Sequence, residues 1–246
     1  MRAVFRRELV SYFTSPIGYV FLAVFYFFSG LFSYLLSVKS GTTDMSSSFS
    51  SLFIILVILI PILTMRIFSE ERKQKTDQLL LTSPVSLTSL VTGKFLAAFV
   101  VYTLGVIINF VYAVIFSAFS TVSWTLFFGN ILGLLLIGAA FIAIGVFVSS
   151  MTENQVVAAV STFAVMLVIL FIDNIASLLE GLNIKISFIE AIVSAIGKGL
   201  SAASIYQKYY DFCIGIIDFS SVLLMLSFVV VFLFLTIRSL EKRRWN

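Results

Sequence analysis

The sequence predicts an all-α integral membrane protein with six transmembrane helices. Hydrophobic residues make up 60% of the 246 residues and charged residues only 11%, and the mean hydropathy is +1.12. A soluble domain carries about 25% charged residues, so this much apolar surface indicates lipid rather than water as the solvent. The apolar residues also fall into charge-free runs, and about 20 residues are enough to cross the hydrocarbon. We expect residues 1–246 to form a single membrane domain.

Residues 2–15 are expected to form a short helix that lies in the membrane interface. Its apolar side chains share one helical face and its basic side chains mostly lie off that face, namely Phe5, Leu9, Tyr12 and Phe13 against Arg2, Arg6 and Arg7. This pattern is typical of a helix with its basic side toward the lipid headgroups. The alternative is a basic flank that only anchors the first span. Pro16 and Gly18 then end the helix and let the chain turn.

Two spans should follow this helix. Ile17–Val38 has the length of span 1, and Leu52–Ile67, with the few residues before it, forms span 2. A loop rich in Ser, Thr and Gly, from Lys39 to Ser51, joins them. Pro61 lies within span 2, so a kink is expected there.

Arg66 to Lys94 is the long polar interruption of the first 150 residues, and it holds five of the 16 basic and three of the 12 acidic residues. Phe68–Leu81 can form a helix in which Ser69 is the N-cap and the acidic first turn favours the positive helix end. A trio of leucines closes this helix and needs a groove or the interface to cover it. Pro84 could open a second short helix. The alternative is an ordinary loop.

Phe95 to Thr152 is free of charge for 58 residues, which suits two spans rather than one. We place them at 95–118 and 126–148, with a tight turn at Ser120–Trp124. The second of them is rich in small residues: Gly129, Gly133, Gly138, Ala139, Ala140 and Gly145. Small residues let helices approach closely, so this span is expected to pack tightly, or else to form a moving helix interface.

Gln155–Ile172 is expected to be span 5, ending at Asp173–Asn174, and Ser220–Ile237 is expected to be span 6. The segment between them is of intermediate polarity. Ile186–Ile196 and Ala202–Phe212 within it look like amphipathic helices too short to span.

Loop charges predict the orientation. Twelve of the 16 basic residues lie in the N-terminal helix, the 66–94 stretch and the tail after span 6, and four lie in the loops of the other side. Basic loops stay in the cytoplasm. Both termini and the 66–94 stretch are therefore expected in the cytoplasm, and the segment between spans 5 and 6 outside.

Motifs for catalysis are missing from the sequence. Gly93–Lys94 lacks the upstream glycine of a phosphate loop and is followed by Phe95. The chain has no histidine and one cysteine, Cys213, which argues against a zinc or haem site. No lysine lies inside a predicted span, so a Ser–Lys dyad in the membrane is unsupported. We expect no enzyme activity and no cofactor in this chain.

The run R-I-F-S-E-E-R-K-Q-K-T-D-Q-L-L-L-T-S-P-V-S from Arg66, followed by G-K-F-L, resembles the signature of type-2 ABC exporter permeases. In that family an acidic–basic run precedes T-x-x-L-L-x-T-S-P, before a G-K that opens the third span. The corresponding positions here are Arg66, Phe68, Glu70, Glu71, Arg72, Lys75, Thr76, Leu79, Leu80, Thr82, Ser83, Pro84, Gly93 and Lys94. The family more often has Gly where Lys75 stands. Phe232–Trp245 and Tyr210–Asp218 look like the branch that includes gliding-motility-associated permeases.

The resemblance covers essentially the whole chain and implies a permease subunit in a bacterial or archaeal plasma membrane. Its partners would be a second permease, identical or homologous, two cytoplasmic ATPases that bind ATP and Mg, and membrane lipids, with no nucleic acid. The 66–94 helix would be the coupling helix that docks in a groove of the ATPase, through Glu70, Glu71, Arg72, Lys73, Lys75, Thr76, Leu79, Leu80, Thr82, Ser83 and Pro84. The outside helices would form an extracellular gate with Glu190, Tyr210, Gly215 and Asp218.

Two other functions stay open on the residues alone. A secondary transporter or channel that works by itself would carry ionisable residues inside its spans or show inverted repeats. The predicted spans offer only Asn109, Asn130 and the edge residues Asp173 and Asn174. A membrane scaffold without a transport role is the other alternative. The apolar, aromatic spans suit a lipid-like, peptide or other bulky amphipathic cargo.

Overall fold

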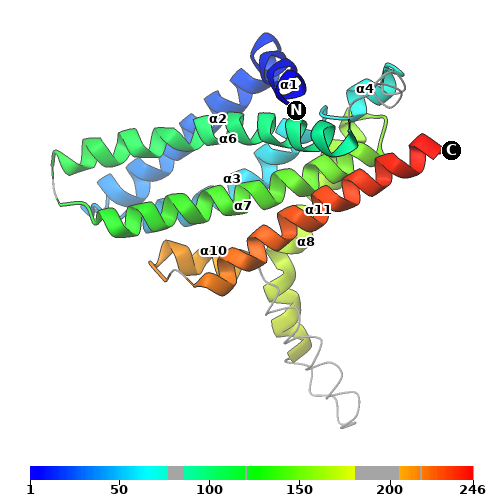
Figure 1. Ribbon diagram of the computed structural model, residues 1–246. Coiled ribbons are helices and arrows are strands. Elements are labelled where there is room, and N and C mark those ends of the chain that lie inside the picture. Colours follow the sequence, from blue (N-terminus) through cyan, green and yellow to red (C-terminus); the bar gives the residue numbers. More distant parts are fainter. Residues whose placement is uncertain (77–85, 120, 181–204, 217, 246) are drawn as a thin grey trace, which may run out of the picture.

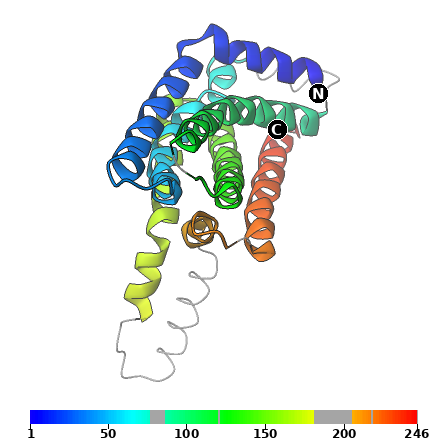
Figure 2. The ribbon, with the colours of Figure 1, turned by 90° about the vertical axis from the view of Figure 1, so that its left-hand side faces the viewer.

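The computed structural model describes residues 1–76, 86–119, 121–180, 205–216 and 218–245. The regular structure in these ranges is helical throughout. The elements are α1 (Arg2–Thr14), α2 (Pro16–Phe32), the π-helix η1 (Ser33–Val38), α3 (Ser46–Thr64), α4 (Ser69–Lys73), α6 (Leu87–Ser117), α7 (Trp124–Met151), α8 (Gln155–Glu180), α10 (Ile205–Cys213) and α11 (Phe219–Trp245). Figure 1 shows α2, α3, α6, α7 and α11 running along one bundle, and Figure 2 shows α1 running across it.

Five helices of the described part are long and apolar enough to cross a membrane, which confirms a multi-pass membrane protein. Their bounds are Pro16–Val38, Ser46–Lys73, Leu87–Ser117, Trp124–Met151 and Phe219–Arg243. The part of α8 whose side chains the structure describes, Gln155–Phe171, is apolar and shorter than these, and α8 leaves the bundle at a steep angle (Figures 1 and 2). The sixth span therefore stays a prediction.

α8 also ends later than the sequence predicts. The helix continues past Asp173 and Asn174 as far as Glu180. The sequence from Gln155 to Glu180 contains neither glycine nor proline, and a polar pair alone does not break a helix that has no such residue. The helix therefore continues beyond Asp173–Asn174, and the end of span 5 at this pair stays a prediction.

The turn from α1 into α2 forms where it is predicted. Ser15 is extended, with φ −102° and ψ 155°, and Pro16 occupies the first turn of α2. Gly18 packs on the end of α1, where a Cβ atom would lie 2.5 Å from the carbonyl oxygen of Tyr12. Only a glycine lets the two helices meet this closely.

The last part of span 1 is a π-helix that the sequence does not predict. Residues Ser33–Val38 form η1 as a direct continuation of α2. Hydroxyl groups stabilise this segment, since Ser48 of α3 donates to the Phe32 carbonyl at 3.2 Å and Ser37 donates to the Asp44 carbonyl at 3.0 Å. Side-chain bonds of this kind help a widened turn to satisfy its backbone groups.

α3 and α7 form the centre of the bundle. Of the 18 most apolar consecutive residues in each span, 67% are buried in α3 and in α7. The corresponding share is 28% in α2, 33% in α6 and 17% in α11. The glycines of α7 receive side chains from its neighbours: Gly138 faces the ring of Tyr102, and Gly145 faces Thr64. Tyr102 also donates to the Leu134 carbonyl at 2.5 Å. The predicted tight packing of this helix is confirmed.

α6 starts earlier than the predicted 95, at Leu87, because Ser86 caps it and accepts a hydrogen bond from the Ser89 amide at 3.4 Å. Lys94 therefore lies within α6 and is 1% exposed. This corrects the expectation that no lysine lies inside a span. Residues 121–123 lie between α6 and α7, within the predicted turn, and α7 begins at Trp124. α10 (Ile205–Cys213) covers the described part of the helix predicted over Ala202–Phe212, whereas residues 186–196 and 202–204 lie outside the described residues.

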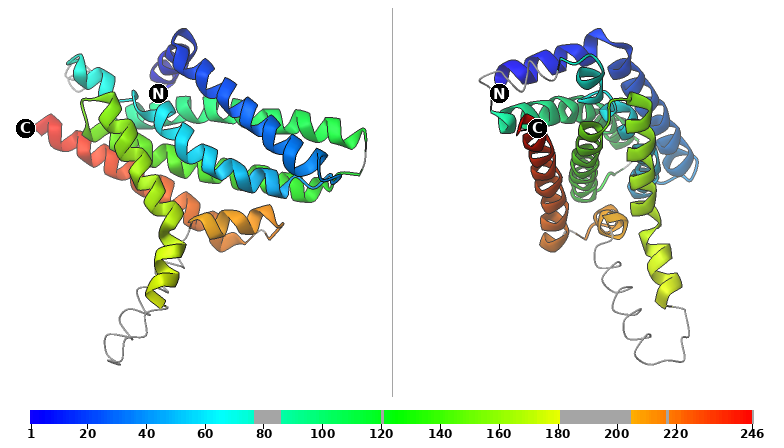
Figure 3. Two further views of the ribbon diagram at one scale, coloured as in Figure 1. Left: turned by 180° about the vertical axis from the view of Figure 1, so that it is seen from behind. Right: turned by 90° about the vertical axis from the view of Figure 1, so that its right-hand side faces the viewer.

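The segments that the charge pattern assigns to one side share one end of the bundle. Figure 3 shows the N-terminus, α4, the turn between α7 and α8 and the C-terminus at that end. The loops after η1 and after α6 meet at the opposite end, where Thr43 donates to the Thr121 carbonyl at 2.8 Å. The segment from Met65 to Thr76 is therefore placed among the ends of several helices.

Candidate functional site

α4 is shorter than the predicted helix over 68–81 and differs from it at both ends. It spans five residues, Ser69–Lys73, and its N-cap is Phe68 rather than Ser69. The Ser69 hydroxyl bonds back to the Met65 carbonyl, so it is not free to cap the helix. The predictions for Leu79, Leu80, Thr82, Ser83 and Pro84 lie outside the described residues.

The chain leaves α4 through a turn centred on Lys75. The Lys75 amide donates to the Arg72 carbonyl at 3.1 Å, and the Thr76 amide donates to the Glu71 carbonyl at 2.9 Å. These two bonds are those of a Schellman motif, which places one residue in the left-handed region. That residue is Lys75, with φ +56°. The turn, rather than the loss of helix propensity, ends α4 here.

A buried lysine joins α4 to α1 and α6. Lys94 Nζ donates to the Ile67 carbonyl at 2.6 Å and lies 2.9 Å from Glu71 Oε2 and 3.2 Å from Glu8 Oε1. It also lies 4.8 Å from the centre of the Phe68 ring. A lysine this deeply buried needs its charge paired. Glu8 of α1 and Glu71 of α4 provide that pairing.

Arg7 closes the cluster from the surface side. Its Nη2 atom lies 2.7 Å from Glu8 Oε1 and 2.5 Å from Glu71 Oε1. Burial lowers the pKa of the Arg7 guanidinium, but the hydrogen bonds and charges of the two carboxylates outweigh it and raise the pKa above its ordinary value. Two cations and two carboxylates thus balance. We call Arg7, Glu8, Glu71 and Lys94 the junction cluster.

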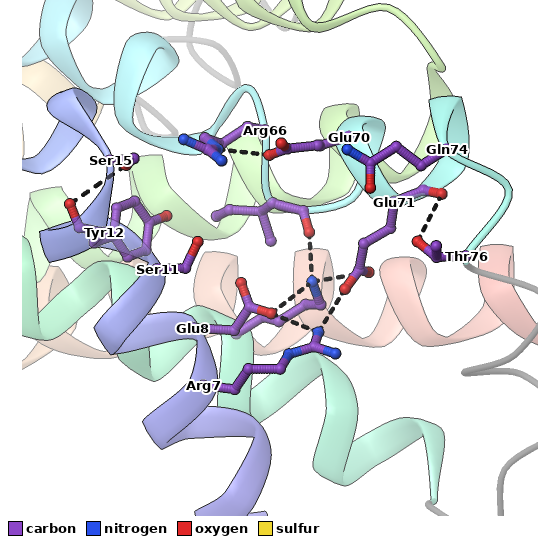
Figure 4. A pocket seen from close by; sticks show the side chains of 12 residues that line it. Arg7, Glu8, Ser11, Tyr12, Ser15, Arg66, Glu70, Glu71, Gln74 and Thr76 are labelled. Atoms are coloured by element: carbon purple, nitrogen blue, oxygen red, sulfur yellow. Dashed lines mark hydrogen bonds and ion pairs between the residues drawn. The ribbon is translucent and has the colours of Figure 1, made fainter.

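The junction cluster lines one side of a cavity of about 330 Å³ (Figure 4). Figure 4 shows Arg7 and Glu8 reaching from α1 toward Glu71, with Arg66 and Glu70 on the opposite side. The remaining lining residues are Ser11, Tyr12, Ser15, Ile67, Gln74 and Thr76. The charged side chains that line the cavity are paired with one another, so the cavity has no net charge.

Further contacts hold Glu70 and Arg72 of α4. Arg66 Nε lies 2.6 Å from Glu70 Oε2. Arg72 donates to the Met151 carbonyl at 2.6 Å and pairs with Glu153 at 2.9 Å. A guanidinium at the last carbonyl of α7 is favoured by the negative end of the helix dipole.

Ser149 binds the start of α4 to the end of α7. Its hydroxyl accepts from the amides of Phe68, at 3.1 Å, and Ser69, at 3.3 Å, and donates to the Met65 carbonyl at 3.1 Å. Ser149 is fully buried. One hydroxyl therefore accepts hydrogen bonds from two buried amides that water does not reach.

We expect Ser149→Ala to lower the free energy of unfolding by about 1–3 kcal/mol, because it leaves these amides without an acceptor. The measurement is a denaturant titration of the purified protein in mixed micelles. Ser150→Ala is the matched control, since Ser150 is equally buried but bonds only to the Phe147 carbonyl of its own helix. Equal effects of the two substitutions would contradict the role given to Ser149.

The sequence-predicted site residues fall into separate places. Of the residues assigned to the ATPase contact, Glu70, Glu71 and Arg72 are paired within the chain, Lys73 and Lys75 are exposed, and Thr76 follows the turn. Of the residues assigned to the interfacial helix, Arg2 and Arg6 are exposed, Phe5 and Leu9 pack on the core, and Arg7 belongs to the junction cluster.

The predicted gate residues lie far along the chain, around α10. Tyr210 is 41% exposed, and Gly215 has φ +88° in the turn after α10. Asp218 lies 4.0 Å from Lys208, and Glu190 lies outside the described residues. α10 itself is held on the bundle, where Tyr209 donates to the Phe49 carbonyl at 2.5 Å.

Glu8, Lys94 and Ser149 were not singled out as site residues from the sequence. Lys94 belongs to the G-K pair at the start of a long charge-free run, and a charge at that place is the signal that could have drawn attention to it. Glu8 and Ser149 carry no comparable signal. Within the described residues, no group of three or more His, Cys, Asp or Glu side chains could hold a metal ion.

A model of a family described as ABC-2 family transporter protein matches residues 21–245, which is most of the chain. No curated protein matches the sequence. The matched range includes α4, Lys94 and Ser149 and excludes α1.

Proposed function

The chain belongs to the ABC-2 family of transporter proteins, and we propose that it is the permease subunit of an exporter driven by a separate cytoplasmic ATPase. Membership makes it the membrane permease of an ABC transporter. In the proposal two ATPases bind ATP and Mg, and two permease subunits, identical or homologous, form the pathway between them. Both termini and α4 face the cytoplasm of a bacterial or archaeal plasma membrane, in line with the positive charge at that end. The gliding-motility branch within the family stays a prediction from the sequence.

In this proposal α4 is the part of the permease that the ATPase moves. A conformational change requires contacts that differ between two states, and ATP supplies that difference in the partner rather than in this chain. The paired charges at Glu70, Glu71 and Arg72 hold α4 on the permease. Leu79 and Leu80, which follow it in the sequence, are proposed to enter the groove of the ATPase, with Thr82, Ser83 and Pro84.

The observation that carries the proposal is the junction cluster. Lys94, a residue of α6, lies 2.9 Å from Glu71 of α4 and 3.2 Å from Glu8 of α1. It therefore connects α4 to both α1 and α6. Ser149 and Arg72 tie α4 to the end of α7, and α3 runs directly into it. A displacement of α4 would therefore act on four helices at once. A loop that only joined two spans would need none of these contacts.

The two ends of the protein would then have different tasks. α10 and the turn at Gly215 lie on the side opposite α4, and we propose them, with Tyr210, Asp218 and Glu190, as the gate at the outer end of the pathway. α1 is proposed to lie in the headgroup region, with Arg2 and Arg6 toward the lipid phosphates.

The test is to purify the native complex from membranes, identify its subunits by mass spectrometry and reconstitute it in proteoliposomes. We expect a subunit that binds ATP, and movement of the co-purifying ligand that needs ATP hydrolysis. If the chain alone moved that ligand along an ion gradient, without any ATPase, a secondary transporter would replace this proposal. A complex without an ATP-binding subunit would contradict it as well.

A further inference from the structure

α10 packs on the bundle through one of its faces. The buried residues of this face recur every three or four positions: Ile205, Tyr209, Phe212 and Cys213. Tyr209 donates to the Phe49 carbonyl of α3 at 2.5 Å. Phe212 packs on Gly133 of α7, where an added Cβ atom would lie 2.7 Å from the Phe212 Cβ atom. α10 therefore bridges α3 and α7, the two helices at the centre of the bundle.

The C-terminal turn of α10 leaves one buried carbonyl that it does not bond. Gly215, with φ +88°, ends the helix in a Schellman motif. Its amide donates to the Phe212 carbonyl at 3.1 Å. The Ile216 amide donates to the Asp211 carbonyl at 2.9 Å. The motif does not bond the carbonyl of the last helical residue. That residue is Cys213, which is 1% exposed, so its carbonyl needs a donor from another element.

Asn130 of α7 supplies this donor. With its amide nitrogen turned toward α10, Asn130 donates to the Cys213 carbonyl at 3.1 Å and to the Phe212 carbonyl at 2.9 Å. This is the orientation in which both the nitrogen and the oxygen of the amide have partners. Asn130 is itself 1% exposed, and a polar side chain within a span is costly unless it is bonded. The negative end of the α10 dipole also favours a donor at this place.

Asn130 and Tyr209 anchor α10 to two different helices, and the same two helices reach α4. α3 runs directly into α4, and Ser149 of α7 accepts from the amides of Phe68 and Ser69 at the start of α4. Helices shift by about 1–2 Å in many conformational transitions, and a hydrogen bond is lost beyond about 3.5 Å. A shift of this size that separates α3 from α7 would break the bonds of one anchor.

We propose that Asn130 is the positioning residue that keeps α10 closed on the bundle, and that its two hydrogen bonds break when the outer gate opens. This rests on the proposed function, in which α10 belongs to that gate, and it assigns the residue that holds the gate closed. While α3 and α7 keep their positions, Asn130 bonds the end of α10. When ATP moves α4, the shift of α7 against α3 releases it.

The single cysteine of the chain reports on α10 directly. Cys213 is buried, so a membrane-impermeant sulfonated maleimide should reach it only when α10 leaves the bundle. The native complex is placed in nanodiscs, where both sides are open to reagent and nucleotide. Labelling of the Cys213 peptide is followed by mass spectrometry with and without ATP. We expect ATP to speed the labelling of the wild type. We expect Asn130→Leu to speed it about tenfold or more without ATP, because the loss of two buried hydrogen bonds favours local opening.

Asn109→Leu is the matched control. Asn109 is also 1% exposed within a span. It accepts from the Ser29 hydroxyl of α2 at 2.6 Å and donates to the Val106 carbonyl of its own helix at 3.1 Å. These bonds join α2 to α6 rather than to α10. Asn109→Leu should therefore leave the labelling of Cys213 at the wild-type rate.

A second variant displaces α10 without removing the donor. Gly133→Ala places a methyl group 2.7 Å from the Phe212 Cβ atom, a distance at which one of the two must move. We expect it to speed the labelling of Cys213 as well. Gly138→Ala is its control, because Gly138 faces Tyr102 of α6 rather than α10.

The outcomes are distinguishable. Labelling of Asn130→Leu at the wild-type rate would overturn the inference, and so would equal rates for Asn130→Leu and Asn109→Leu, because the effect would then be a general loosening. If the complex contains a subunit that hydrolyses ATP but ATP does not change the labelling of the wild type, Asn130 is a fixed anchor. The inference then fails and the proposed function stands. A complex without an ATP-binding subunit contradicts the proposed function, and the ATP-driven opening with it.

Discussion

Replacing Lys94 by methionine is expected to lower the free energy of unfolding by about 3–5 kcal/mol, because it removes the cation between two largely buried carboxylates. Glu8 and Glu71 are 15% and 17% exposed in their side chains, whereas Lys94 is 1% exposed. Arg7 alone would then face both carboxylates from the surface. We also expect the variant to lose ATP-driven transport, since α1 and α6 would no longer be tied to α4. Denaturant titration of the purified chain measures the first effect.

Two further variants test whether the loss of the buried charge pairs causes the drop in stability. Lys39→Met removes an exposed lysine at the opposite end and should leave stability unchanged. Adding Glu8→Gln and Glu71→Gln to Lys94→Met should restore part of the stability, because the buried carboxylates are neutralised and Arg7, with 52% of its side chain exposed, can be solvated. If Lys94→Met were as stable as Lys39→Met, the junction cluster would have no role in holding α4.

Reversing both acidic residues of α4, Glu70→Lys with Glu71→Lys, is expected to uncouple ATP hydrolysis from transport while the protein still inserts. The two new lysines would face Arg66, Arg7 and Lys94, so every internal pair of the α4 carboxylates becomes a repulsion. Coupling between distant sites is worth about 1–3 kcal/mol, so we expect the amount of ligand moved per ATP to fall about tenfold or more. The measurement compares hydrolysis and transport of the co-purifying ligand in proteoliposomes.

Glu241→Lys is the matched control for this variant. Glu241 lies on α11 at the same end of the bundle and pairs only with Arg238 in the described residues. Its reversal should leave the ratio of transport to hydrolysis unchanged. Unchanged coupling in the Glu70→Lys, Glu71→Lys protein would contradict the assignment of α4 as the coupling element.

Five spans could be located from the sequence because most of their length is free of charge, although Lys94 lies within α6. The start of α2 at Pro16 and the turn before Trp124 follow from local rules for proline and for charge-free length. The ends of helices were harder to predict, since α6 begins within the polar stretch and α8 runs through Asp173. From the sequence alone, polar residues that cap or extend a helix predict a loop.

The length of α4 could not be predicted from propensity. Phe68–Leu81 contains no proline or glycine, yet the helix ends at Lys73 through the left-handed turn at Lys75. The one signal was indirect: the resembled family more often has Gly at this position. A left-handed residue is where glycine is preferred, so the departure from the family pattern marks a backbone feature rather than a neutral change.

The junction cluster depends on tertiary packing that no local pattern shows. Glu8 and Lys94 are 86 positions apart, and they meet because α1 folds back over the start of α6. Glu71 was expected to face a partner and instead lies between Lys94 and Arg7. The sequence located the candidate segment, and only the structure divides its charges between the inside of the permease and its surface.

In the proposed function α4 contacts a cytoplasmic ATPase. A photo-crosslinking amino acid at Gln74, which is exposed at the end of α4, tests it most directly, with the same probe at exposed Thr121 of the opposite end as the reference. We predict that the Gln74 probe crosslinks, in native membranes, to a subunit that is also labelled by a photoreactive ATP analogue, and that the Thr121 probe does not. Crosslinking of that subunit from Thr121 and not from Gln74 would contradict both the orientation and the role of α4.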